Sequence, residues 1–414
     1  MGETAITAAE VVRPRVRALV AAYAVSSYGN FLNLIALSLF TYEVTGSGLG
    51  LGLIMALRLF SGFLAGLAAG ALAARAGRRR LMITADVCQA VAMAVLAVCA
   101  RSASAWLPAV VVIVLGAGNT FFTVALRSAV PVLVGSEARV RVNGQLMTVR
   151  SVATVAGFAS AAPVIGIAGY GAAFAVNGAS FLVSAAAMFF LRLRTDEEPA
   201  TPQGAERPDS VSLLRVMTAV PALMLGMILL RGADALASSS HNVALPVVSA
   251  LHSPQNPAVF MTQFWASWAA GTLVAHQVLK RRKASRTEDR WGLYAYVGGT
   301  CAMSLCFVLA FTGPAPLVLM VIVGVAGIAD GFTEIVYTSM LQKMPDRERS
   351  RLFGLSATVE TCGFALGMVA AAAALEAWSV LAVVGVFHGL AFCGALTLFL
   401  TTLPGRRTAD GRPA

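Results

Sequence analysis

Twelve runs of roughly 20 apolar residues follow one another along this 414-residue chain, and each is long enough to cross a bilayer as a helix. A water-soluble core could not cover so much apolar surface. Of the residues, 58% are hydrophobic and 12% are charged, whereas about 25% of a soluble domain is charged. The sequence therefore predicts an all-α membrane protein. Its twelve transmembrane helices are expected at residues 18–42, 49–74, 81–100, 107–126, 142–167, 170–191, 221–248, 258–279, 291–312, 317–341, 352–374 and 377–403.

One motif occurs twice in the chain. The sequence RVRVNG at 139–144 returns 210 residues later as RSRLFG at 349–354, and each copy opens a long apolar run. A tandem repeat of membrane helices is typical of transporters. We therefore expect two pseudo-symmetric six-helix bundles, residues 1–192 and 216–414, joined by a polar, Pro-rich cytoplasmic linker at 193–215.

The basic residues indicate how the chain is oriented. Nearly all Lys and Arg outside the apolar runs lie at the two termini and in alternate loops, whereas the opposite loops hold only Arg101. Basic loops remain in the cytoplasm, so both termini and the linker are expected there. The net charge of +11 is explained by this pattern, and we expect no nucleic-acid partner. Abundant Ala, Gly and Arg suggest a bacterial genome, which predicts a multi-pass protein of the bacterial cytoplasmic (inner) membrane.

Motifs for nucleotide, cofactor or metal chemistry are missing from the sequence. It contains no phosphate-binding Walker loop, no dinucleotide fingerprint and no His-Glu-x-x-His, and its six cysteines and four histidines have no metal-ligand spacing. We therefore expect no enzyme activity, no cofactor and no metal. Transport would draw on an ion gradient or run downhill.

Polar residues occur near the middle of four of the predicted helices, when depth is counted at ~1.5 Å per residue. A charged group at this depth costs at least ~3 kcal/mol unless something compensates for it, so these residues are expected to line a watery substrate cavity. They are Asn30 and Asn33 in the first helix, Asn119, Thr120 and Thr123 in the fourth, Arg231, Asp234 and Ser238 in the seventh, and Asp330 and Glu334 in the tenth.

Spacing within the helices suggests which of these residues couple to protons. Asp330 and Glu334 are four residues apart, and two carboxylates that close in a low dielectric should not both stay ionised. Asp234 is three residues from Arg231 and can pair with it, and Glu360 is expected at the depth of Glu334. We expect Asp234, Asp330, Glu334 and Glu360 to carry protons. A structural ion pair and structural hydrogen bonds are the alternative.

The loop after the second helix carries a known signature. Residues 70–80 read GALAARAGRRR, which resembles the Gly-x-x-x-Asp-Arg-x-Gly-Arg-Arg motif of the major facilitator superfamily, with Ala74 in place of the acid. The sequences YEVTGS at 42–47, RSAVP at 127–131, NGASF at 177–181 and PDRERSRLFG at 345–354 resemble its drug:proton antiporter branch, which includes macrolide efflux pumps and the enterobactin exporter. The resemblance covers about residues 16–403. It implies the major facilitator fold, with the first, fourth, seventh and tenth helices around a central cavity.

Two further groups of residues complete the expected site. Tyr337 and other aromatic residues near the cavity could stack on a flat organic ligand, although packing is the alternative. The signature loop, the repeated motif and charged residues of similar depth on the third to fifth helices are expected to form a cytoplasmic gate. The gate residues are Gly70, Arg75, Gly77, Arg78, Asp86, Arg127, Arg150, Arg349 and Arg351. Arg58 lies deep in the second helix and needs a partner that the sequence does not name.

These observations favour a secondary active exporter of an amphipathic small organic compound, such as an antibiotic or another secondary metabolite. It would act as a monomer, by proton antiport and alternating access. A siderophore exporter is the alternative within transport, since the same branch serves both. A membrane sensor or enzyme that uses the fold without moving solute is the alternative of another class, because Ala74 and Asn30 depart from the family pattern.

Overall fold

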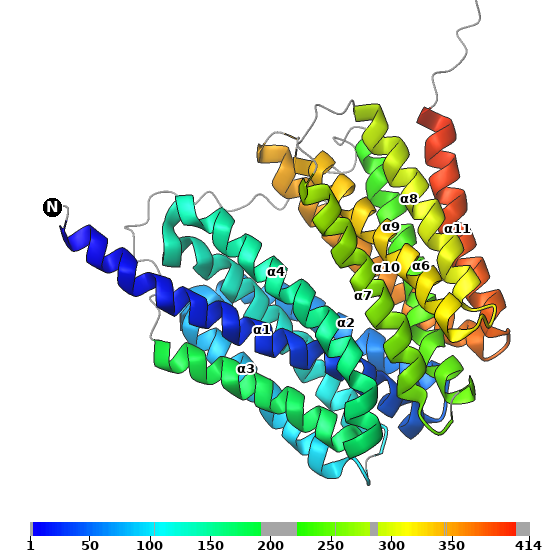
Figure 1. Cartoon of the computed structure of the whole chain (residues 1–414), viewed down its shortest axis with the longest axis horizontal. Coiled ribbons are helices and arrows are strands. Elements are labelled where there is room, and N and C mark those ends of the chain that lie inside the picture. Colours follow the sequence, from blue (N-terminus) through cyan, green and yellow to red (C-terminus); the bar gives the residue numbers. More distant parts are fainter. Residues whose placement is uncertain are drawn as a thin grey trace, which may run out of the picture.

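The computed structural model describes residues 3–102, 104–191, 222–252, 254–281, 289–342, 344 and 346–402. Every regular element in these ranges is a helix (Figure 1). The helices are α1 (Glu3–Thr45), α2 (Gly48–Ala76), α3 (Arg78–Cys99), α4 (Trp106–Leu191), α6 (Ala222–His252), α7 (Pro257–Arg281), α8 (Asp289–Ala310), α9 (Pro316–Gln342), α10 (Asp346–Leu375) and α11 (Val380–Thr402). The predicted linker at 193–215 lies outside the described residues.

The twelve apolar runs map onto these ten elements because α4 contains three of them. Ten stretches are long and apolar enough to cross a membrane, and one of these, Arg141–Leu191, has 51 residues. At a rise of ~1.5 Å per residue that stretch is more than twice as long as a bilayer core is thick. The less apolar α7, with 25 residues, is also of crossing length. The prediction of an all-α membrane protein is confirmed, with about ten to twelve spans.

Short local signals set where the helices begin and end. Ser47 precedes α2, and its hydroxyl accepts a hydrogen bond from the Gly50 N–H at 2.9 Å, as an N-cap residue does. Gly77, with φ at 82°, separates α2 from α3, and Gly169, with φ at 75°, interrupts α4 where the sequence predicts a loop. The predicted loop at 127–141 is wrong: helical conformation continues there, and α4 joins the fourth and fifth runs.

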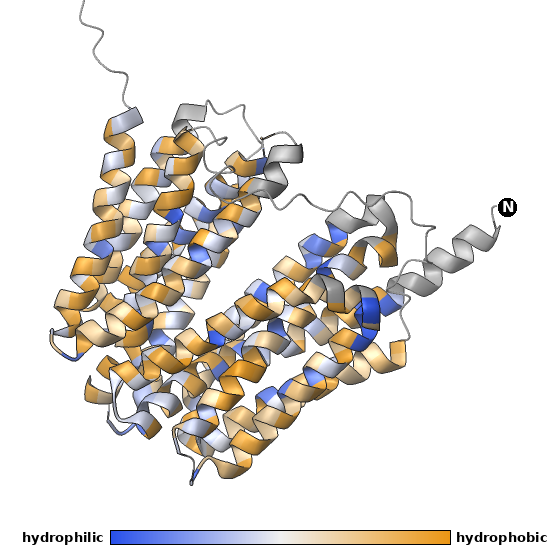
Figure 2. Cartoon of the chain, turned by 180° about the vertical axis from the view of Figure 1, so that it is seen from behind, coloured by the Kyte–Doolittle hydropathy of each residue, from blue (hydrophilic) through white to orange (hydrophobic). Residues whose placement is uncertain are grey.

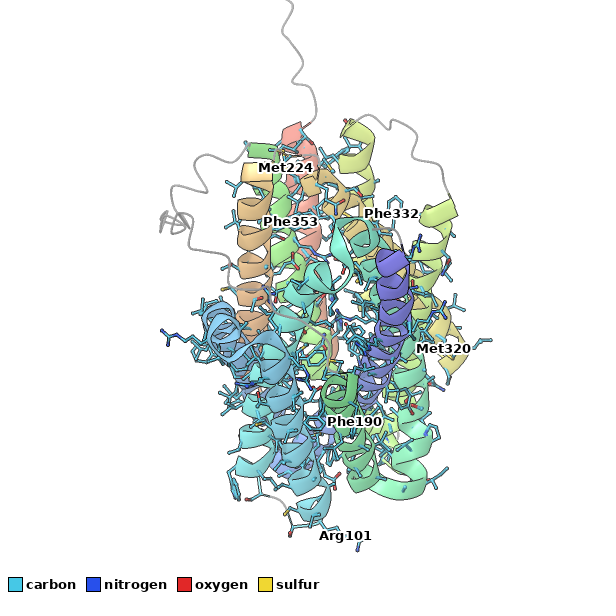
Figure 3. The ribbon with its side chains drawn as sticks, turned by 90° about the vertical axis from the view of Figure 1, so that its left-hand side faces the viewer. Arg101, Phe190, Met224, Met320, Phe332 and Phe353 are labelled. Atoms are coloured by element: carbon cyan, nitrogen blue, oxygen red, sulfur yellow. The ribbon has the colours of Figure 1, made fainter. Side chains whose placement is uncertain are left out.

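The helices form two bundles, α1–α4 and α6–α11, which meet at one end of the molecule only (Figure 1). At that end the apolar cores are shared between the bundles: Phe40 and Leu51 belong to one cluster with Met368, and Phe158 to another with Trp265. Toward the other end each bundle has a core of its own. The bundles therefore diverge from the shared end. Arg101 lies at the bottom of Figure 3, at this shared end.

Close approach and polar contacts hold the shared end together. A Cβ on Gly52 of α2 would lie 2.8 Å from the backbone oxygen of Met368 in α10, closer than real Cβ atoms come. Nearby, the Leu49 N–H donates to a carboxylate oxygen of Glu376 at 3.3 Å. The contact between α2 and α10 therefore depends on the missing side chain of Gly52.

The outer faces of both bundles are apolar, as Figure 2 shows along nearly all the helices. Large hydrophobic side chains stand on these faces with most of their surface exposed, among them Val98 (85%) and Ile167 (88%). Such a surface suits contact with acyl chains. The polar residues that remain inside the helices form the sites described next.

Candidate functional site

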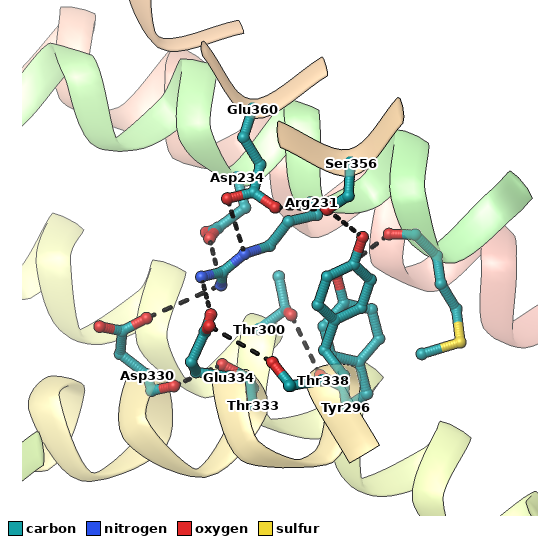
Figure 4. A network of polar contacts seen from close by, with 12 residues as sticks. Arg231, Asp234, Tyr296, Thr300, Asp330, Thr333, Glu334, Thr338, Ser356 and Glu360 are labelled. Carbon is teal, nitrogen blue, oxygen red and sulfur yellow. Dashed lines mark hydrogen bonds and ion pairs between the residues drawn. The ribbon is translucent and has the colours of Figure 1, made fainter. Parts of the chain in front are cut away.

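A cluster of four carboxylates surrounds the guanidinium of Arg231 (Figure 4). Asp234, one turn along α6, lies 3.6 Å from it. Asp330 of α9 lies 3.9 Å away and Glu360 of α10 lies 3.8 Å away. In the shortest contact of the set, Arg231 donates to a carboxylate oxygen of Glu334 of α9. The structure thus brings all four residues predicted to carry protons around one predicted cavity residue.

Hydroxyl groups extend this acidic cluster. The Tyr337 hydroxyl donates to Ser356 at 2.6 Å, and the Ser356 hydroxyl donates to Glu360 at 2.7 Å. Thr338 donates to Glu334 at 3.4 Å. The Arg231 guanidinium also lies 5.9 Å from the centre of the Tyr337 ring, within the range of a cation–π contact. Tyr337, predicted as a cavity residue, therefore belongs to the acidic cluster.

Further contacts place the cluster between helices of the C-terminal bundle. Trp268 and His276 of α7 lie near the Asp330 side chain. Asp234 is 6% exposed, and one of its carboxylate oxygens has no hydrogen-bond partner among the described residues. The Glu334 side chain is 47% exposed, which is the largest exposure in the set.

The charges of this cluster do not balance, because one arginine faces four acids. If all four were ionised, the group would carry three negative charges in an apolar bundle. Ionised carboxylates that are partly desolvated and incompletely paired are costly. Binding of protons or other cations would lower this cost, and each proton bound would remove one partner from Arg231.

A second polar site lies inside the N-terminal bundle, as a cavity of about 330 Å³. Its walls include three of the predicted cavity residues, Asn30, Asn119 and Thr123, and two predicted gate residues, Asp86 and Arg150. The other lining residues are Tyr23, Ser26, Ser27, Phe31, Leu34, Arg58, Gln89, Phe122 and Phe181.

This cavity corrects the expected position of Asp86. Asp86 is 1% exposed and lies eight residues into α3, about 12 Å from the start of the helix by its rise. It therefore sits inside the bundle rather than at the interface. No ion pair joins it to Arg127 or Arg150 in the described part of the chain. Arg127 is exposed and is not part of the cavity wall.

Other predicted residues lie apart from both sites. Asn33 is fully buried, and its amide has no hydrogen-bond partner within the described ranges. Thr120 donates to its own helix at Gly116, at 3.0 Å, and packs against Gly62 of α2. Ser238 offers its backbone oxygen to Asn242 at 2.9 Å.

The signature loop forms the turn from α2 to α3. Gly77 adopts a positive φ and its N–H donates to the Ala73 oxygen at 3.1 Å, with Arg75 exposed before it and Arg78 opening α3. The next residue, Arg79, donates to the backbone oxygens of Met188 and Phe189 at 2.8 and 2.7 Å, a link to the end of α4 that the sequence did not suggest. Gly70 lies in α2, and Arg349 and Arg351 lie in α10 at positions whose side chains are outside the described part.

Several residues of these sites were not predicted as site residues, and four of them illustrate why. Ser356 stands four positions before Glu360, a helical spacing that could have revealed it. Gln89 stands three positions after Asp86, and the same argument applies. Thr338 stands four positions after Glu334 on α9, and the same spacing could have revealed it. Arg58 reaches its cavity from α2, and the sequence holds no signal that would pair it with Asp86 of α3.

Comparison with known proteins agrees with this architecture. The model of the Major Facilitator Superfamily matches residues 19–345. No curated protein sequence matches the chain. Similar solved structures include a bacterial homologue of the human lysosomal transporter Spinster in an inward-facing, unoccupied conformation, with 12% identity, a TM-score of 0.67, and coverage of 94% of this chain and 95% of that one.

Two further solved structures share the fold. The POT family transporter PepTSo has 11% identity and a TM-score of 0.70, with 94% of this chain and 97% of that chain covered. A mutant of the nucleoside transporter NupG has 14% identity and a TM-score of 0.63, with 93% and 100% covered. Since the family match spans most of the sequence, the chain belongs to the Major Facilitator Superfamily, whose members are membrane transporters and not enzymes.

Proposed function

We propose that this chain is a secondary active exporter that moves an amphipathic small organic compound out of a bacterial cell in exchange for protons. The observation that carries the proposal is the convergence of Asp234, Asp330, Glu334 and Glu360 on Arg231. The sequence elements that resemble the drug:proton antiporter branch favour export over import. An antibiotic or another secondary metabolite is the expected cargo.

Coupling would follow from competition for Arg231. A proton on Glu334 removes the closest partner of the guanidinium, and the half-exposed Glu334 side chain is the member of the cluster best placed to exchange protons with water. Arg231 would then pair more strongly with the remaining acids. Because these acids lie on three helices, α6, α9 and α10, each protonation state favours a different packing of the helices, which is what an ion-driven change of conformation requires.

Alternating access would use the divergence of the two bundles. The open side is the side of the basic loops, which the positive-inside rule assigns to the cytoplasm. An exporter takes up its cargo in this state. To release it on the other side, the protein must separate α2 from α10 at Gly52 and Glu376, where the shared end is held together. A single chain supplies both bundles, so a monomer in the lipid bilayer suffices.

Reconstitution into proteoliposomes tests the proposal. Uptake of a panel of antibiotics and siderophores is measured with the lumen acidic, with no gradient, and with the gradient reversed. We expect uptake of at least one antibiotic only with the acidic lumen, and its loss in Asp330→Asn and Glu334→Gln. Arg101→Gln, which removes an exposed charge far from the cluster, serves as the control.

Other results of the uptake assay would favour an alternative function or contradict proton coupling. Uptake restricted to siderophores would favour the alternative function, a siderophore exporter. Uptake that ignores the gradient, or that survives in both carboxylate variants, would contradict proton coupling. Ligand binding without any flux would favour a sensor that uses the transporter fold.

A further inference from the structure

The cavity in the N-terminal bundle contains an arginine and an aspartate that do not pair with each other. Arg58 comes from α2 and Asp86 from α3, and both line the same cavity of about 330 Å³. Within the described residues neither of them takes part in an ion pair. Opposite charges on two walls of one cavity can each hold the oppositely charged group of a ligand.

A neutral polar side chain that lines the same cavity, Gln89, is also without hydrogen-bond partners among the described residues. Gln89 is 1% exposed, and neither its amide nitrogen nor its amide oxygen has a hydrogen-bond partner among the described residues. One carboxylate oxygen of Asp86 is equally without a partner there. Buried polar groups are normally hydrogen-bonded, so three unpartnered atoms on adjacent turns of α3 point to a ligand or to water.

The backbone keeps room for this arrangement. A Cβ on Gly118 of α4 would lie 2.7 Å from the side-chain carbon of Gln89, so only glycine leaves Gln89 in its present position. Arg150, the other arginine of the cavity, lies 6.0 Å from the centre of the Phe31 ring and is exposed. Arg58 is therefore the inner cation of the cavity.

Aromatic side chains supply the remaining wall. Phe31, Phe122 and Phe181 line the cavity together with the polar residues. An apolar or aromatic body could pack against these rings while its charged groups face Arg58 and Asp86. The cavity thus offers an inner cation, Arg58, besides the exposed Arg150, together with one anion, an amide and an apolar face.

From this arrangement we infer that the cavity binds the dipolar part of the substrate, an aromatic zwitterion whose anionic group faces Arg58 and whose cationic group faces Asp86. The inference deepens the proposed function, on which it rests, by naming the substrate class. Gln89 donates to the anionic group or accepts from the cationic one. A compound with only one of the two charges leaves the opposite wall of the cavity unpaired.

Equilibrium binding to the purified full chain in detergent tests the inference without any gradient. Two matched sets of probes are used: phenylalanine, phenethylamine and phenylpropanoate, and tryptophan, tryptamine and indolepropanoate. Within each set the body is the same and only the charges differ. We expect each zwitterion to bind about tenfold more tightly than both of its singly charged relatives, since one lost charge-assisted hydrogen bond changes affinity by about that factor.

Variants assign the two charges separately. Asp86→Asn should weaken binding of the zwitterions and amines and leave the acids unchanged, whereas Arg58→Gln should weaken binding of the zwitterions and acids and leave the amines unchanged. Arg58→Lys keeps the charge and covers the case in which Arg58→Gln does not fold. Gly118→Ala, which displaces Gln89, should weaken all three classes, and Arg101→Gln should alter none.

Several results would overturn the inference. They are equal affinity for all three members of a set, no binding of either zwitterion to the folded wild type at millimolar concentration, and a preference for zwitterions that survives both charge-removing variants. The gradient-driven uptake described above would be unaffected, so failure of this inference and failure of proton coupling remain distinguishable.

Discussion

Arg231 and Glu334 are 103 residues apart in the sequence and in direct contact in the structure, where they join α6 to α9. Arg231 also contacts Asp234, Asp330 and Glu360, so a single cation links three helices of the C-terminal bundle. The first two predictions concern this link.

Replacing Glu334 by Gln should uncouple transport while leaving the protein folded. The amide keeps the shape of the side chain but can neither release a proton nor neutralise Arg231. We expect gradient-driven flux to fall about tenfold or more. A tenfold change corresponds to about 1.4 kcal/mol. Exchange of substrate without a gradient should continue. Flux assays under both conditions measure this. Ser339→Ala on the exposed face of α9 is the control, and loss of both activities together would argue for a structural role of Glu334.

Replacing Arg231 by Gln should destabilise the protein more than any single change among the four acids. It leaves all the carboxylates without their common cation, and removal of one partner from a buried pair costs about 3–5 kcal/mol. Thermal unfolding in detergent would show a lower Tm, partly restored in Arg231→Lys and unaffected in the exposed Arg127→Gln. An unchanged Tm in Arg231→Gln would mean that the cluster does not stabilise this state.

Replacing Gly52 by Val should shift the protein away from the present conformation. The new side chain would collide with the backbone oxygen of Met368, so the shared end should loosen and the opposite ends of the bundles should approach each other. Spin labels at positions 147 and 353, in a background without the six native cysteines, would report a shorter distance. Gly298→Ala, where an added Cβ meets nothing within 4 Å, is the matched control. A distance distribution identical to that of the wild type would contradict this prediction.

Replacing Glu376 by Gln should have a smaller effect in the same direction. Its carboxylate accepts a hydrogen bond from the Leu49 N–H in the first turn of α2, where a negative charge is favoured by the helix dipole. The amide keeps the hydrogen bond and loses the charge, for which about 0.3–1 kcal/mol is typical. The same pair of spin labels would show a modest rise of the short-distance population, and this rise should diminish at high salt. A shift as large as that of Gly52→Val would mean that charge, and not packing, controls this end.

The sequence predicted site residues well where their depth in the membrane and their spacing along one helix were sufficient to identify them. Counting along the apolar runs placed Asp330 and Glu334 at the same level as Arg231, and the structure brings them together. Helical spacing shows which residues share a face, but not which neighbouring helix that face meets. For this reason Arg58 was left without a site, and Asp86 was assigned to a gate although it lies inside the bundle.

Only some of the helix boundaries were predicted, for a similar reason. Gly77 and Gly169 end or interrupt helices where the sequence suggests it, because a positive φ favours glycine. The region at 127–141 contains Pro131 and Gly135 as well as charged residues, yet helical conformation continues through it. The polar residues predicted a loop there, whereas the backbone is helical in the structure.

Proton movement during transport tests the central claim most directly. Proteoliposomes that contain a pH-sensitive dye are given the transported compound without an imposed gradient, and luminal pH is followed for the wild type and for the Asp330→Asn/Glu334→Gln double variant. The account predicts that the wild type moves protons opposite to the compound and that the double variant exchanges the compound without moving protons. Equal proton movement in both proteins would contradict it.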